Sequence, residues 1–267
     1  MPTVHVKRWS GRLGNNCIQL SNAVYLAQEL GIRHVKHPPH KLFRNQIIDT
    51  GAEFGSHPGL SGRFFYGKSL LQHAPAMSVH RRKRIFLETL RPEIVLRKPA
   101  GPQMESLVRD DSTLVIHVRS GDVFGPNPHP GYVQPPLWYY RTIIENRAWK
   151  SILLVCQDSL NPVINRLCAD YPIIRINSST LDTDFSILCS ARNLVGSHGT
   201  FTHAAFYFSS NIGRYWIPGS MKRAAADFAL AFPEQVSVVK CPGYIKVGEW
   251  MNSPEQRNIM LKYQPTT

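Results

Sequence analysis

The stretch that decides the fold reads TLVIHVRSGD, from Thr113 to Asp122. Its first half is a short apolar run that predicts a buried strand, and its second half is polar and contains a glycine. In open α/β sheets, the carboxyl ends of parallel strands line the ligand crevice. We therefore expect Arg119 and its neighbours at the binding edge of such a sheet.

Outward from this stretch, apolar β-rich runs alternate with helical patterns, which predicts βαβ units and a parallel sheet. The expected strands are 3–6, 113–118, 151–155, 173–176, 193–196 and 237–240, and the expected helices are 16–29, 136–146, 162–169, 184–191 and 201–208. The Pro/Gly-rich run 97–102 separates an N-terminal α/β domain, residues 1–100, from a C-terminal Rossmann-like domain, residues 101–267. Residues 36–67 lack a clear periodicity, so no fold is predicted for them.

Charge and composition limit the classes of function. The chain has 267 residues with 31 Lys+Arg and 18 Asp+Glu, a formal net charge of +13. This excess excludes an acidic solvating protein and fits an anionic partner: nucleic acid, a membrane surface or a phosphorylated small molecule. The basic cluster 80–84 predicts a helix whose basic turns face solvent, with a polyanion site or peripheral membrane contact as the alternative. The sequence contains no zinc-finger or RNA-stacking motif that would indicate nucleic-acid binding.

The apolar runs and the cysteines indicate where the protein works. No apolar run approaches the roughly 20 residues that cross a bilayer, and the N-terminus lacks a signal-peptide pattern, so a cytoplasmic protein is expected. The cysteines form no C-x-x-C pair and are predicted to be reduced core residues without a zinc site. They are Cys17, Cys156, Cys168, Cys189 and Cys241.

A first motif, Gly11 to Asn16, follows the first expected strand and opens a helix. Its two glycines let the backbone approach a ligand, and a helix N-terminus offers N–H groups to phosphate. The motif predicts a cradle for a phosphate or a sugar nucleotide, and an ordinary tight turn is the alternative.

A second motif surrounds Arg119. Its guanidinium is always charged and offers a planar fork to phosphate oxygens, which suits a leaving diphosphate. His117 points to the same side of the strand. The alternative is a salt bridge between Arg119 and Asp122 that only closes the turn.

A third motif extends from Asp184 to Phe201 and indicates helix, strand, small-residue turn and helix. The turn from Ser197 to Thr200 places backbone N–H groups and hydroxyls at the start of a helix, which predicts a second anion nest.

Together the three motifs resemble those shared by α1,2-, α1,6- and protein O-fucosyltransferases: G-R-L-G-N, then H-V-R-x-G-D, then D-F-x-x-L-x-x-A followed by S-x-x-T-F. Their order and spacing also agree. The resemblance implies a GT-B architecture, in which two Rossmann-like domains face each other across a cleft. It further implies GDP-fucose as donor, inversion at the anomeric carbon, no metal or other cofactor, and a glycan or other hydroxyl acceptor on the side of the N-terminal domain.

The resemblance also implies residue roles. Arg119 would bind the β-phosphate and help the leaving group depart, while His117 and Asp184 would contact guanine. Arg12 and Asn15 would approach the sugar or diphosphate. The residues expected to bind the donor are Gly14, His117, Asp122, Asp184, Ser197, His198, Gly199, Thr200 and Phe201, and those expected in catalysis are Arg119, Arg12 and Asn15.

Departures from the family pattern leave other donors open. Ser120 stands where the family often has a second arginine, and His198 and Gly199 stand where Ser or Thr is common. UDP- or GDP-linked xylose, rhamnose or another sugar is therefore the alternative donor. The sequence does not determine the oligomeric state.

Several other patterns have two interpretations. Asp182 and Asp184 form a D-x-D that suggests a divalent cation, but Asp182 is also explained as a helix cap. Candidate general bases are Asp49, Glu53 and Asp122. The histidines at 34, 37 and 40 are expected in a loop with exposed imidazoles, and a metal site is the alternative. The aromatic residues 138–140 are expected to pack in the core, and a ring that stacks on a base or an acceptor sugar is the alternative. A non-catalytic polyanion-binding module is the remaining functional alternative.

Overall fold

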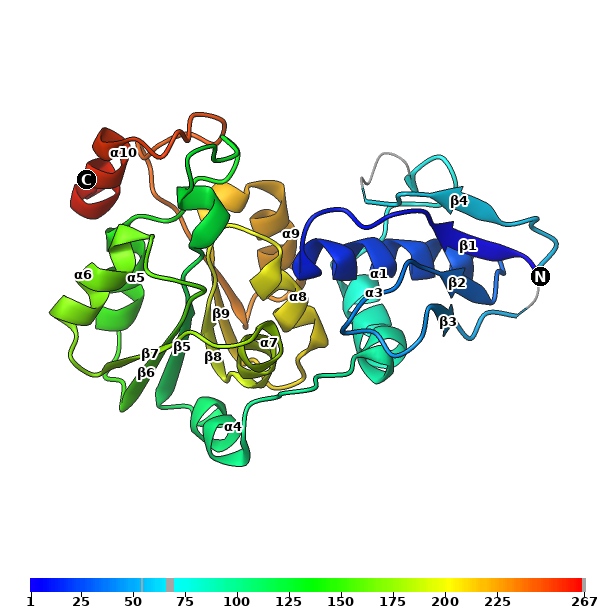
Figure 1. The fold of residues 1–267 in the computed structure, drawn as a ribbon, viewed down its shortest axis with the longest axis horizontal. Coiled ribbons are helices and arrows are strands. Elements are labelled where there is room, and N and C mark those ends of the chain that lie inside the picture. Colours follow the sequence, from blue (N-terminus) through cyan, green and yellow to red (C-terminus); the bar gives the residue numbers. More distant parts are fainter. Residues whose placement is uncertain (54, 66–69, 266–267) are drawn as a thin grey trace. The chain divides into compact units, whose positions relative to one another are not determined.

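The computed structural model describes residues 1–53, 55–65 and 70–265, and the chain forms two compact units (Figure 1). One unit comprises Met1–Arg97 and His203–Ser210, and the other comprises Lys98–Thr202 and Asn211–Thr267. Both contain parallel strands and helices, which confirms the α/β fold class. Residues 54, 66 and 67 of the segment for which no fold was predicted lie outside the described residues.

The N-terminal unit is built on a four-stranded sheet of order β3-β2-β1-β4. The strands are β1 (Thr3–Val6), β2 (His34–Lys36), β3 (Ile47–Asp49) and β4 (Leu60–Gly62). The neighbours of β1 run parallel to it, and β3 is an antiparallel edge strand. Helix α1 (Leu13–Glu29) connects β1 to β2, and nearly all of its residues up to Ala27 are buried. The sequence predicts the first strand and the helix of this βαβ unit, but not β2.

Helix α3 (Val79–Ile85) contains the whole basic cluster and continues into a π-helical turn, Phe86–Leu90, and a 3-10 turn, Arg91–Glu93. The expectation that its basic residues face solvent is wrong for two of them. The Arg82 guanidinium donates to Ser21 Oγ at 2.5 Å and to Asn22 Oδ1 at 2.9 Å.

Lys83 points inward as well. Its Nζ lies 3.9 Å from the centre of the Phe206 ring and donates to the Phe206 carbonyl at 3.3 Å. Burial lowers the pKa of Lys83 to about 8. Arg82 and Lys83 therefore join α3 to neighbouring segments of its own unit. Because both side chains point inward, they do not present their charges to a polyanion at the surface.

The C-terminal unit is built on a six-stranded, fully parallel sheet of order β10-β9-β8-β5-β6-β7. Its strands are β5 (Thr113–His117), β6 (Ser151–Val155), β7 (Ile174–Asn177), β8 (Asn193–Val195), β9 (Arg214–Pro218) and β10 (Val236–Val239). Its helices are α4 (Pro102–Arg109), α5 (Leu137–Glu145), α6 (Pro162–Asp170), α7 (Leu181–Ser190), α9 (Arg223–Ala231) and α10 (Pro254–Lys262); α8 (Phe201–Phe208) begins in this unit, and short 3-10 turns span Gly121–Phe124 and Gly219–Met221.

Numbered within the unit, the strand order is 3-2-1-4-5-6, the order of dinucleotide-binding doubly wound sheets. Helices α5 and α6 cover one face, whereas α7 and α9 cover the other (Figure 1). The direction of winding reverses between β5 and β8, and ligands bind at such a switch point. The sequence predicted the strands on both sides of this point but missed α4, β9, α9 and α10.

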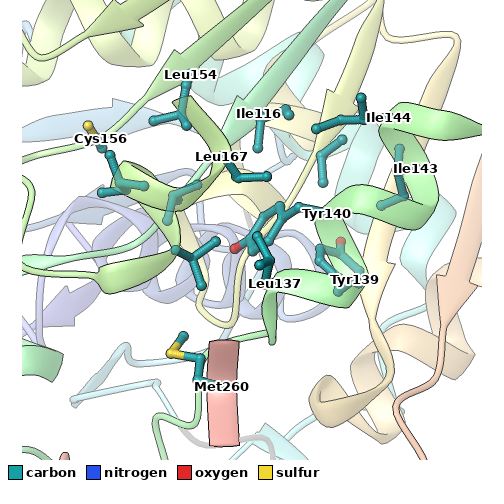
Figure 2. Packing of buried hydrophobic residues seen from close by; sticks show 14 of the residues in the cluster. Ile116, Leu137, Tyr139, Tyr140, Ile143, Ile144, Leu154, Cys156, Leu167 and Met260 are labelled. Atoms are coloured by element: carbon teal, nitrogen blue, oxygen red, sulfur yellow. The ribbon is translucent and has the colours of Figure 1, made fainter. Parts of the chain in front are cut away.

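A cluster of core residues fills the space between α5, α6 and the sheet (Figure 2). Leu137, Tyr140 and Ile144 recur at helical spacing on α5 and are buried. Met260 of α10 closes the cluster. The predicted core packing is confirmed for the fully buried rings of residues 139 and 140, whereas residue 138 is half-buried.

Two further expectations concern the cysteines and the membrane. None of the five cysteines forms a disulfide, as predicted; Cys17 and Cys156 are buried, whereas the other three are half-buried. Among the described residues, no helix is long and apolar enough to cross a membrane.

Tyr139 and Tyr140 provide a matched test of this core. The Tyr139 hydroxyl donates to the carbonyls of Gly196 at 2.8 Å and Trp216 at 3.1 Å, whereas the Tyr140 hydroxyl has no hydrogen-bond partner among the described residues. We expect Tyr139→Phe to lower the free energy of unfolding by about 1–2 kcal/mol, and Tyr140→Phe to leave it unchanged or raise it, because an unpaired buried hydroxyl costs stability. Equilibrium urea unfolding measures both, and equal losses in the two variants would show that the two hydroxyls do not differ in this way.

Candidate functional site

The site of the C-terminal unit lies where β5 and β8 end side by side. Ile116 pairs with Val195 in the parallel ladder, so the residues that follow each strand emerge at the same edge. The Ser197 hydroxyl lies 2.8 Å from His117 Nδ1. Strand pairing thus brings together the second and third sequence motifs, which are far apart in the chain.

Arg119 is the cation at this edge. Its guanidinium donates to the His198 carbonyl at 3.4 Å, pairs with Asp122 at 3.3 Å and lies 4.3 Å from the centre of the Tyr132 ring. Its side chain remains 19% exposed, and that of Asp122 is 43% exposed. The salt bridge that the sequence left as an alternative is therefore present, but it is exposed and weak. A ligand phosphate can compete with it for the guanidinium.

Gly199 allows the loop to approach Arg119 closely. Its φ of +150° is a backbone conformation that residues with a side chain rarely adopt. A Cβ on Gly199 would lie 2.9 Å from Arg119 Nη1. Any larger residue here displaces the guanidinium.

The two histidines of the site are neutral at physiological pH. Burial, together with the charge of Arg119, lowers the pKa of His117 to about 3 and that of His198 to about 4. His117 packs on Phe201 with ring centres 5.4 Å apart, and His198 Nδ1 lies 3.1 Å from the Ser220 hydroxyl. Two neutral imidazoles therefore lie beside one permanent positive charge.

Asp184 belongs to α7 and lies beside the last residue of β7. Its Oδ1 accepts from Asn177 Nδ2 at 2.7 Å, and burial raises its pKa to about 6. Thr180, not Asp182, caps α7, because its hydroxyl accepts from the Thr183 N–H. Asp182 and Asp184 are two positions apart on a helix and so point to different faces. Among the described residues, no three metal-ligating side chains lie close enough to hold an ion together.

The first motif belongs to the N-terminal unit and opens α1. Gly11 has a φ of +69°, Arg12 is the exposed N-cap residue with an extended backbone, and the Asn15 amide lies over Gly11. Gly14 is buried in the first turn. Asn16 Nδ2 donates to the backbone carbonyl of residue 10 at 3.2 Å and holds the turn against the helix. The structure thus places Arg12, Gly14 and Asn15 at one helix N-terminus.

Side chains that no sequence motif indicated support the Arg119 turn. Asn161 Nδ2 donates to the Arg119 carbonyl at 3.0 Å, and Asp158 accepts from the Ser120 hydroxyl and from the Gly121 N–H. Ser120 is therefore a buried support of the turn. Asp158 follows β6 as Arg119 follows β5, so the same strand-end argument could have found it; the neighbours at 132 and 134 carry no comparable signal.

The candidate general bases differ in their surroundings. Asp49 pairs with Arg33 at 2.9 Å, and hydrogen bonds from Arg33 and Gly51 lower the pKa of this carboxyl, which makes it a weaker base. Asp122 lies beside the Arg119 guanidinium, and Glu53 is an exposed residue of the N-terminal unit. Asp122 is therefore the candidate that shares an edge with Arg119.

The three histidines after α1 do not form one loop. His37 and His40 lie in the loop after β2, as expected, but the expected exposure is wrong: His37 is buried and His40 is half-buried. Both pack on Trp9, with ring centres 5.2 and 5.4 Å away. The expectation is wrong for His34, which begins β2 and pairs with Thr3 of β1. Two of these rings thus serve an aromatic cluster within the N-terminal unit.

Asp184 predicts a specific pH dependence. The folded state retains its proton up to about pH 6, whereas the unfolded chain loses it near the ordinary value of 3.8. Stability contributed by this group is therefore lost as the pH rises between these values. Relative to Asp184→Asn, we expect the wild-type free energy of unfolding to fall by about 2 kcal/mol between pH 4 and pH 7.

Urea unfolding at both pH values tests this expectation. His117 and His198 act in the opposite direction, because their lowered pKa values contribute stability that is lost below pH 6.5. That contribution is common to both proteins and cancels in the difference. Parallel pH profiles for wild type and variant would show that Asp184 titrates normally.

Comparisons with known proteins give fold neighbours only. No family model matches the chain, and no curated protein matches its sequence. Among solved structures, the NodZ α-1,6-fucosyltransferase soaked with GDP-fucose is 11% identical, with a TM-score of 0.47, over 80% of this chain and 94% of that chain. The fucosyltransferase NodZ from Bradyrhizobium is 12% identical, with a TM-score of 0.41, over the same shares.

Proposed function

We propose that this protein is a glycosyltransferase that moves a sugar from a nucleoside diphosphate to a hydroxyl group, with GDP-fucose as donor and a glycan or other hydroxyl compound as acceptor. The observation that supports the proposal is the position of Arg119 and the Ser197–Thr200 turn at the switch point of a 3-2-1-4-5-6 sheet. The motif resemblance supplies the identity of the donor.

The chemistry suits these residues. When a glycosyl-phosphate bond breaks, negative charge develops on the departing diphosphate and the sugar becomes oxocarbenium-like. A preorganised guanidinium stabilises that charge, and its loss typically costs about 100- to 1000-fold in rate. The permanent charge of Arg119 lies beside the neutral rings of His117 and His198, so among these three residues the guanidinium is the group that attracts a phosphate by its charge.

The finer parts of the proposal rest on the resemblance. We propose inversion at the anomeric carbon, with Arg12 and Asn15 acting on the sugar or diphosphate and the N-terminal unit serving the acceptor. His117 and Asp184 are proposed to contact guanine. The proposed reaction requires no metal ion, so activity should be insensitive to a chelator.

A ligand panel with Arg119→Ala tests the proposal. A ligand at 100 times its dissociation constant adds about 2.7 kcal/mol of stability, so GDP should raise the melting temperature of the wild type measurably. We expect Arg119→Ala to melt normally without ligand, to bind GDP about 10- to 100-fold more weakly, and to lose about 100- to 1000-fold in turnover.

The same panel contains UDP, dTDP and their sugars. Selective stabilisation by UDP or dTDP would replace GDP-fucose by one of the alternative donors. An absence of stabilisation by every nucleotide, or normal turnover in Arg119→Ala, would overturn the proposal.

Gly199→Ala tests the close approach of the loop to Arg119. The added methyl group lies 2.9 Å from Nη1, so the guanidinium must move, and we expect about a ten-fold loss of GDP affinity. Gly248→Ala is the matched control, since Gly248 also has a positive φ, +108°, but nothing lies within 4 Å of its added Cβ. Calorimetric titration with GDP should separate the two variants, and equal affinities would contradict the proposed contact.

A further inference from the structure

Arg119 is held by long polar contacts. Its distances to the His198 carbonyl, 3.4 Å, and to Asp122, 3.3 Å, lie at or beyond the upper end of the hydrogen-bond range. The Asp122 contact is also exposed and is screened by salt. Two weak contacts at the edge of a guanidinium do not fix its plane.

The Tyr132 ring supplies the missing constraint. The guanidinium carbon of Arg119 lies over the Tyr132 ring, 4.3 Å from its centre, in a cation–π contact. Stacking on an aromatic face restricts the rotation of a planar guanidinium. Tyr132 belongs to the irregular connection 125–136 between the 3-10 turn after Arg119 and α5. Its position therefore depends on what holds this connection.

Gln134 holds it. Its side chain is fully buried, and Nε2 donates to the Tyr132 carbonyl at 3.0 Å and to the His198 carbonyl at 3.3 Å. The second acceptor is the carbonyl that Arg119 also uses. The two carbonyls fix the orientation of the amide, because only its nitrogen can donate to them.

This arrangement has a cost. The other amide atom, Gln134 Oε1, is buried without a hydrogen-bond partner among the described residues. An unsatisfied buried acceptor destabilises the folded state. A residue kept at such a cost is expected where geometry serves function.

We propose that Tyr132 and Gln134 are positioning residues, which orient the Arg119 guanidinium toward the β-phosphate of the donor. This inference rests on the proposed function. Tyr132 fixes the plane of the guanidinium, and Gln134 links the backbone of Tyr132 to that of His198.

The experiment compares GDP with GMP, which lacks the β-phosphate. Calorimetric titrations of the wild type, Arg119→Ala, Tyr132→Leu, Tyr132→Phe and Gln134→Met give the preference for GDP over GMP in each. We expect Tyr132→Leu and Gln134→Met to lose about five-fold or more of this preference, and Tyr132→Phe, which keeps the ring, to retain it. Tyr171→Leu, which removes a half-buried tyrosine elsewhere, should also retain it.

A second readout needs no nucleotide. The heteronuclear NOE of the Arg119 Nε–H group reports its mobility, which should rise in Tyr132→Leu and Gln134→Met but not in Tyr132→Phe. Unchanged midpoints of urea unfolding in Gln134→Met would exclude general loosening as the cause.

The outcomes separate the two ideas. If Arg119→Ala loses the GDP preference while Tyr132→Leu and Gln134→Met keep it, the positioning role is wrong and the proposed function stands. If Arg119→Ala keeps the preference, or if the wild type binds none of the nucleotides of the panel, the proposed function fails, and the positioning role fails with it. If the wild type binds UDP or dTDP instead of GDP, the comparison is made with that nucleotide and its monophosphate.

Discussion

The pairing of β5 with β8 is the constraint on which the site depends. These strands are separated by β6, β7 and three intervening helices in the chain, yet they are neighbours in the parallel ladder. Their register places Arg119 and Ser197 at one edge. Because side chains alternate along a strand, a slip of one residue would turn His117 and Arg119 to the other face and remove the site.

Electrostatics at this edge follows from burial. Desolvation keeps His117 and His198 neutral and favours the protonated form of Asp184, whereas a guanidinium stays charged in almost any environment. Arg119 therefore supplies the permanent positive charge among these four residues. The surrounding turn is held by hydrogen bonds from the segment after β6, so its shape is set before any ligand binds.

Local sequence determined the regular elements near the site. The strand Ser151–Val155 and the helix Phe201–Phe208 were predicted with their observed bounds. Both segments are apolar enough to indicate a regular element from the sequence alone. The strand-end argument also placed Arg119 at the edge of the sheet, and the small-residue turn indicated Ser197 as part of an anion nest. The short strands β2 to β4 and the strand β9 were not predicted, since three to five residues among prolines and glycines carry little periodic signal.

Only the tertiary structure decided what surrounds the predicted residues. The ring under Arg119 and the amide that holds it come from the irregular connection 125–136, and the inward turn of Arg82 depends on a partner helix that lies 60 residues earlier. Likewise, His203–Ser210 belongs to the N-terminal unit although the chain enters α8 from the other one. Such contacts have no local signature: periodicity reports which face of a segment is buried, whereas the partner that buries it is chosen by packing of the whole chain.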